Sequence, residues 1–107
     1  MCGLLDGLDV LLAEVGAAPD RIVLVGGGAR SPAYRCVLAD LSGLPVLVPD
    51  HPEQAAAGAC VQAAAVLHQR PVEEVRDAWN LRTGTVTEPA PDGMGPLVRA
   101  TYRIALG

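Results

Sequence analysis

One short stretch of this sequence has residue types and spacing suited to binding a phosphorylated ligand. It runs from Gly26 to Ser31, reads Gly-Gly-Gly-Ala-Arg-Ser, and joins the apolar run 22–25 to Pro32. Glycines permit backbone angles closed to other residues and let a ligand approach the main chain closely. A helix that begins at Pro32 would add free N–H groups and the positive end of its dipole, which suit phosphate. Three glycines also suit a plain turn, so this pattern alone allows both interpretations.

Ser31 has two candidate roles at this bend. Its hydroxyl can cap the helix that starts at Pro32, or it can donate to a ligand, and we expect one role rather than both. A dinucleotide-binding fingerprint fits less well, because Gly26 and Gly28 match its first two glycines but position 31 is serine. A Walker A loop is excluded, since the chain contains no lysine.

The elements that must position this bend follow from apolar periodicity and from glycine and proline punctuation. Continuous short apolar runs predict strands buried on both faces, and the helix between two such strands predicts a parallel pair. Two strands alone would leave both sheet edges open, so we expect the sheet to be incomplete. The predicted order is helix 3–15, strand 22–25, a helix from 32 that Gly43 ends, strand 46–48, helix 52–68, helix 71–79, loop 80–95 and helix 97–106.

The composition indicates that part of the surface is covered by other polypeptide. Half of the 107 residues are hydrophobic and the mean hydropathy is +0.31. A domain of this size buries a modest share of its surface, so the excess apolar side chains need a partner domain or subunit. A homodimer formed through exposed apolar surface is one such arrangement.

Several classes of function are disfavoured by charge and residue usage. A net charge of −4 and three aromatic residues do not suit nucleic-acid binding, which uses basic faces and stacking platforms. No apolar run approaches a membrane span, and the N-terminal residues do not resemble a signal peptide. Three widely spaced cysteines suit a reducing cytoplasm, where we expect them to be small buried hydrophobes. His51 and His68 are too far apart to predict a metal site.

Several spaced motifs together resemble the C-terminal segment of the FGGY carbohydrate kinases, most closely the xylulokinases. The resemblance covers roughly residues 3–70, and it extends plausibly to the tail. The family pattern is an apolar strand, GGGA(R/K)S, an aromatic residue, a helix and strand of the form lAD…G.pV, and E…A.GAA..A. The matching residues here are the stretch from Ile22 to Pro32, Tyr34-Arg35, Leu38-Ala39-Asp40, Gly43-Leu44-Pro45-Val46, Glu53 and Ala57-Gly58-Ala59.

The resemblance implies a fold, a ligand and site residues. The fold would be part of a ribonuclease H-like (actin-like ATPase) α/β domain, with short parallel strands, crossover helices and a helical C-terminal tail. The ligand would be ATP, with Mg²⁺ in the intact enzyme. Gly58 matches a family glycine that permits close packing, and the family often carries asparagine where this chain has Ser31. The implied adenosine-binding residues are Gly26, Gly27, Gly28, Ala29 and Ser31.

The family's catalytic aspartate and sugar-binding residues lie upstream of the segment resembled here, so we assign no catalytic residue to this chain. Residues 1–79 would form the C-terminal portion of the nucleotide-binding domain, and 80–107 its loop and terminal helix. The intact cytoplasmic enzyme would convert D-xylulose and ATP to xylulose 5-phosphate and ADP, with the sugar bound by an N-terminal domain. The alternatives are a non-catalytic half-domain that dimerises, or the same segment of a kinase for another sugar or polyol.

Overall fold

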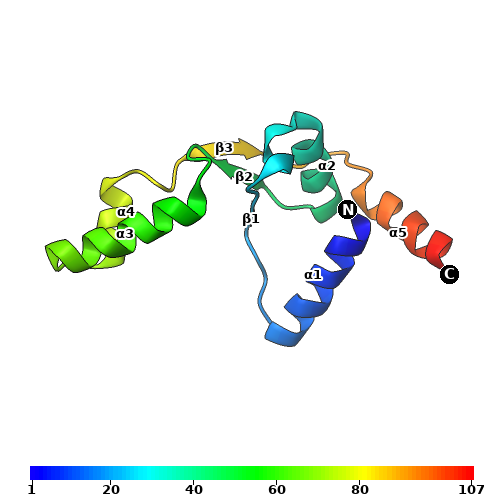
Figure 1. Cartoon of the computed structure of the whole chain (residues 1–107). Helices are drawn as coiled ribbons and strands as arrows, with labels where there is room; N and C mark the ends of the chain where they lie inside the picture. Colours follow the sequence, from blue (N-terminus) through cyan, green and yellow to red (C-terminus); the bar gives the residue numbers. More distant parts are fainter.

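The computed structural model describes all 107 residues and shows a mixed α/β arrangement (Figure 1). A three-stranded sheet lies between a pair of helices on one side, α3 and α4, and three helices on the other. None of the helices is both long and apolar enough to cross a membrane. The elements are α1 (Cys2–Val15), β1 (Ile22–Val23), the 3₁₀ turn η1 (Gly27–Arg30), α2 (Pro32–Ser42), β2 (Val46–Pro49), α3 (Gln54–His68), α4 (Val72–Ala78), β3 (Gly84–Thr87) and α5 (Gly95–Leu106).

The helices begin and end at the residues that capping rules favour. Helix α2 starts at Pro32, with the Ser31 hydroxyl accepting a 3.2 Å hydrogen bond from the Tyr34 N–H. Helices α1 and α2 end at Gly16 and Gly43, whose φ values of 68° and 70° are left-handed. The five predicted helices are confirmed to within two residues at each boundary.

The parallel pair predicted from the two apolar runs is confirmed. Strand β1 pairs with β2 in parallel, with Ile22 opposite Val46 and Val23 opposite Leu47. Regular β-structure ends at Val23 rather than Val25, although the Leu24 N–H still donates to the Leu47 carbonyl at 2.9 Å. The chain then turns away at the glycine bend.

The predicted loop 80–95 is wrong in part, because it contains strand β3. This strand pairs antiparallel with β2, which makes β2 the central strand and leaves β1 and β3 as the two edges. The β-branched run Thr85-Val86-Thr87 suits a strand, but it is only three residues long and lies among prolines and glycines that indicate loops. A Cβ at Gly84 would collide with the Val48 carbonyl, so β3 pairs closely here because position 84 is glycine.

The buried core is small for a chain of this length. Only 11 of 107 residues are buried. The radius of gyration is 16.9 Å, whereas a compact domain of this length would measure about 13 Å. The larger core cluster joins α1, α2 and β2, and the smaller one joins α3 and α4; they consist of Cys2, Leu5, Leu38, Ala39, Leu41 and Val46, and of Val61, Ala65 and Val75.

Two expectations about packing are wrong: that all three cysteines are buried, and that Gly58 permits close packing. Cys36 and Cys60 are exposed, and only Cys2 is buried as predicted. A Cβ at Gly58 would meet nothing within 4 Å, so this glycine does not mediate close packing within the chain. Both Cys60 and Gly58 lie on α3, which packs chiefly against α4 and extends away from the sheet (Figure 1).

Ion pairs connect helix α5 to helix α1. One guanidinium nitrogen of Arg99 lies 2.7 Å from a carboxylate oxygen of Asp6 and 2.6 Å from one of Asp9. Arg103 reaches the same two aspartates at 2.9 and 3.4 Å. Hydrogen bonds from Arg99 and then Arg103 lower the pKa of Asp6 below its ordinary value. No local sequence pattern links Asp6 and Asp9 to arginines some ninety residues away.

This charge cluster predicts a weak acid sensitivity of the α1–α5 contact. Because the Asp6 pKa is lowered in the folded state, its contribution to stability is present above the unfolded pKa near 3.8. That contribution is lost as pH falls further, through the folded pKa. Arg99 is only 14% exposed, but its partners Asp6 and Asp9 are 31% and 50% exposed, so solvent screens the pairs. We therefore expect Arg99→Ala to lower the Tm at pH 7 by no more than about 5 °C. Thermal unfolding of both proteins from pH 7 to pH 2.5 should show the difference shrinking; a constant difference would contradict the assignment.

Candidate functional site

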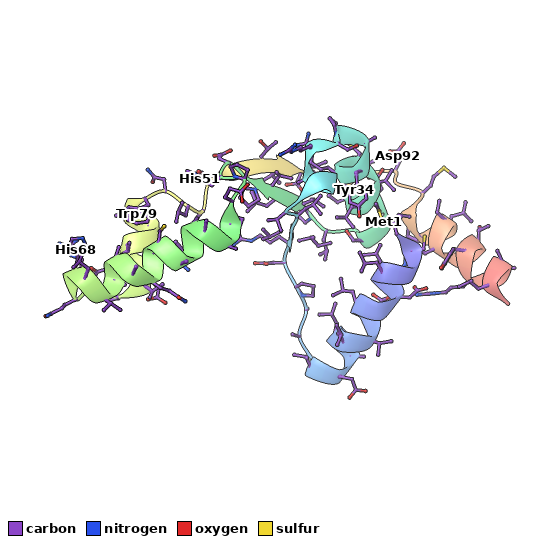
Figure 2. The ribbon with its side chains drawn as sticks, viewed as in Figure 1. Met1, Tyr34, His51, His68, Trp79 and Asp92 are labelled. Carbon is purple, nitrogen blue, oxygen red and sulfur yellow. The ribbon has the colours of Figure 1, made fainter.

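The glycine bend forms one wall of a cavity at the carboxyl ends of β1 and β2. The cavity has a volume of about 570 Å³. Its first wall consists of residues 24–27 with Ala29 and Arg30, and its second wall is the β2–α3 connection, residues 48–53. Figure 2 shows His51, in the second wall, where this connection reaches the first turn of α3.

The two walls meet because β1 and β2 are parallel. Parallel strands end at the same edge of a sheet, and the loops that follow them enclose a crevice there. The glycine pattern predicts the first wall, whereas the second wall, residues 48–53, was not predicted. The signal was available, since a predicted parallel pair places the segment after residue 48 beside the segment after residue 25.

Two glycines of the bend have distinct functions in the first wall. Gly26 has φ 89° and ψ −161°, a conformation that is essentially restricted to glycine and turns the chain away from β1. Gly27 has ordinary φ, and a Cβ built on it would meet nothing within 4 Å. Gly27 lines the cavity, and the space that a side chain would take at this position is open.

Gly28 and Ser31 do not line the cavity. A Cβ at Gly28 would lie 3.2 Å from a ring carbon of Tyr34, so this glycine accommodates the tyrosine ring. Ser31 uses its oxygen to cap α2, the first of the two roles that the sequence left open. Because η1 lies between Gly26 and α2, the α2 N-terminus also lies outside the cavity lining. Of the five predicted residues, the structure brings Gly26, Gly27 and Ala29 together in the cavity wall.

The second wall is held by strand β3. The Asp50 N–H donates to the carbonyl of Thr83, just before β3, at 3.1 Å. The Gln54 side-chain amide donates to the His51 carbonyl, and the Glu53 carbonyl accepts from the Ala57 N–H at 2.9 Å. The strand that the sequence analysis missed thus fixes the backbone of the segment that faces the glycines.

The cavity offers backbone and a few charged groups. Arg30 contributes one positive charge beside the glycine bend, while Asp50 and Glu53 contribute negative charge from the opposite wall. The volume falls within the range of small-molecule sites. No group of three or more histidine, cysteine, aspartate or glutamate side chains is placed to hold a metal ion. The arrangement can hold and orient a polar ligand, with acceptors for hydroxyl groups on one wall and donors on the other.

Comparison with known proteins identifies the family. Residues 1–67 match the C-terminal domain of the FGGY family of carbohydrate kinases. The xylulose kinase of Streptomyces coelicolor is 36% identical over 85 residues, which cover 79% of this chain and 18% of that protein. The xylulose kinase of Streptomyces rubiginosus is 38% identical over the same shares. The autoinducer-2 kinase of Photorhabdus laumondii is 41% identical over 59 residues, 55% of this chain and 11% of that protein.

These matches define how much of an enzyme the chain represents. It spans less than one fifth of the length of the xylulose kinases it matches. No solved structure matches the chain. The family match includes α1, both parallel strands and nearly all of α3, and so contains both walls of the cavity. The chain therefore belongs to the FGGY family of carbohydrate kinases.

Proposed function

We propose that this chain forms the nucleotide-binding part of an ATP-dependent sugar kinase, and that the cavity between the glycine bend and the β2–α3 connection holds ATP. The supporting observation is the free space beside Gly27, in a wall that Gly26 turns away from the sheet. Main-chain groups at residues 26 and 27 would lie against the ribose and phosphates. Gly28 and Ser31 would act indirectly, through Tyr34 and the start of α2.

The proposal separates nucleotide binding from phosphoryl transfer. Phosphoryl transfer depends on positioning and on stabilising charge across a closed cleft. The acids of this cavity, Asp50 and Glu53, lie on one wall. The groups that activate the acceptor hydroxyl would come from other polypeptide. Mg²⁺ bound with ATP would be held chiefly by the phosphates, as is common for this ion. The surrounding fold would be the partial ribonuclease H-like domain expected from the sequence.

The xylulose kinase relatives favour D-xylulose as the acceptor in the intact enzyme, with xylulose 5-phosphate and ADP as products. The autoinducer-2 kinase relative favours a second candidate, an acceptor outside the pentuloses. The acceptor would be selected by residues outside this chain, because the cavity described here is assigned to the nucleotide.

Titration calorimetry with ATP and ADP tests the nucleotide site. We expect measurable binding in the millimolar range or tighter, with Gly27→Val weakening it by about tenfold or more, or ~1.4 kcal/mol. A Cβ added at position 27 would meet no other atom within 4 Å, so the Tm should hardly change. Gly58→Val is the matched control, since position 58 is equally open and lies outside the cavity. Binding that is absent, or that is unaffected by Gly27→Val, would refute the nucleotide site.

A further inference from the structure

A segment outside the family match pairs with the second wall of the cavity. The match ends at residue 67, whereas β3 begins at Gly84. Val48 and Pro49 of the wall lie opposite Thr85 and Gly84. The next wall residue, Asp50, donates its N–H to the residue just before β3. Three consecutive residues of the wall are therefore paired with β3 or with the residue that precedes it.

Gly84 lies where β2 and β3 approach each other most closely. The Asp50 N–H bonds to the Thr83 carbonyl at 3.1 Å, so this position of the antiparallel ladder is hydrogen-bonded. Hydrogen-bonded and non-hydrogen-bonded positions alternate along such a ladder. Pro49 and Gly84 therefore form a non-hydrogen-bonded pair, in which the strands lie closer together, and proline has no N–H to donate. The position of the wall at Pro49 thus depends on how closely Gly84 lets the strands approach.

A side chain at position 84 has no room. An added Cβ would overlap the Val48 carbonyl and lie 2.8 Å from a methyl carbon of Leu47. Gly84 is not one of the glycines with a left-handed φ, so glycine is required here by space and not by conformation. The Val48 carbonyl belongs to the backbone and cannot rotate away as the end of a side chain can. Alanine would push β3 away from β2 and lengthen the neighbouring hydrogen bond from Asp50 to Thr83.

Thr83, which accepts the Asp50 N–H, is fixed by its own turn. Its hydroxyl donates to the Asn80 carbonyl at 3.0 Å, and Asn80 has a left-handed φ of 53°. Strand β3 begins at the residue after Thr83. The carbonyl that holds the wall is therefore itself held on both sides, by the turn before it and by the strand after it.

We infer that Gly84 is a positioning residue for the cavity: its missing side chain lets β3 approach β2 closely enough to fix the wall that faces the glycine bend. The identity of the ligand rests on the proposed function. Gly84 does not line the cavity and acts on it through the hydrogen bond from Asp50 to Thr83. A residue beyond the family match thereby controls the affinity of a site whose lining lies wholly within that match.

Gly84→Ala tests this role with two measurements. Hydrogen exchange followed by NMR without nucleotide should show the Asp50 amide accelerated by about tenfold or more beyond any change at the Leu38 amide of α2. Titration calorimetry should show the affinity for ATP weakened by about tenfold or more. Leu5→Ala is the control for lost stability, because Leu5 is buried in the core cluster and does not line the cavity. It should accelerate Asp50 exchange no more than Leu38 exchange, and leave the ATP affinity within about twofold of wild type.

A pair of threonines gives a second comparison, which does not require Gly84→Ala to fold. Thr83 and Thr101 are both exposed, and each donates its hydroxyl to a backbone carbonyl, at 3.0 and 2.9 Å. Only Thr83 holds the wall. Thr83→Ala should accelerate exchange of the Asp50 amide by about threefold, whereas Thr101→Ala should leave it unchanged.

The remaining outcomes separate the positioning role from the nucleotide site. Equal Asp50 exchange in the two threonine variants, or in Gly84→Ala and wild type, would overturn the positioning role. A Gly84→Ala protein that binds ATP as tightly as Leu5→Ala does would overturn it too, and would leave the nucleotide site standing. Wild-type protein that binds no ATP would refute the nucleotide site, and the positioning role with it, whatever the exchange rates are.

Discussion

Replacing Gly95 with alanine should destabilise the protein by about 1–3 kcal/mol or more, because a Cβ at this position has no room. Gly95 is the first residue of α5 and is buried against the end of α2. An ideal Cβ built on it would overlap the backbone carbonyl of Asp40 and lie 3.1 Å from the Leu41 Cα. Backbone atoms cannot swing aside as a flexible side chain does, so α5 would have to move away from α2.

Gly58→Ala is the matched control for this substitution. Gly58 lies inside α3, and an added Cβ would meet nothing within 4 Å. Alanine there should stabilise the chain by about 0.5–1 kcal/mol, through higher helix propensity and a less flexible unfolded state. Urea unfolding followed by far-ultraviolet circular dichroism measures both free energies. Equal effects for Gly95→Ala and Gly58→Ala would mean that α5 does not pack on α2 as described.

Displacement of α5 would also affect the cavity beside the glycine bend indirectly. The segment between β3 and α5 is tied to α2, where the Ala90 N–H donates to an Asp40 carboxylate oxygen at 2.7 Å. Strand β3 in turn continues from the residue that holds the Asp50 backbone. The C-terminal third, which lies beyond the family match, therefore supports the second wall of the cavity as well as α1 and α2.

What the sequence could predict is the part of the fold governed by local patterns. Helix α2 was predictable in detail, because Ser31, Pro32 and Gly43 specify its ends and its apolar spacing specifies its buried face. The parallel pair followed from two short apolar runs joined by that helix. The glycine bend was predictable as a turn between a strand and a helix, since the residues that specify it are consecutive in the sequence.

What the sequence could not predict depends on contacts between distant segments. Strand β3 is identified by its pairing with β2, and its own residues, between Gly84 and Pro89, indicate a loop. The pairing of Asp6 and Asp9 with Arg99 arises only after α1 and α5 are placed side by side. Cys36 and Cys60 were expected to be buried because free cysteines usually are. They are exposed because a chain this small encloses only a small core.

Leu5 and Leu4 are adjacent leucines for which the structure predicts opposite outcomes on truncation in the isolated chain. Leu5 is 3% exposed and belongs to the core cluster with Leu38 and Val46. Leu5→Ala should cost about 2–4 kcal/mol, because it removes buried methyl groups and leaves a cavity that few neighbours can fill. Leu4 is 67% exposed, so Leu4→Ala should change the free energy of unfolding by no more than about 0.5 kcal/mol.

The size of the Leu5 effect follows from how α1 is attached. Only Cys2 and Leu5 of this helix are buried, and its C-terminal half leads away from the sheet (Figure 1). Truncating Leu5 therefore removes a large share of the apolar contact that α1 makes. The ion pairs of Arg99 and Arg103 with α1 are screened by solvent and cannot offset that loss of stability. Urea unfolding of the two variants should separate their midpoints clearly. Similar midpoints would show that α1 is not anchored through its first turn.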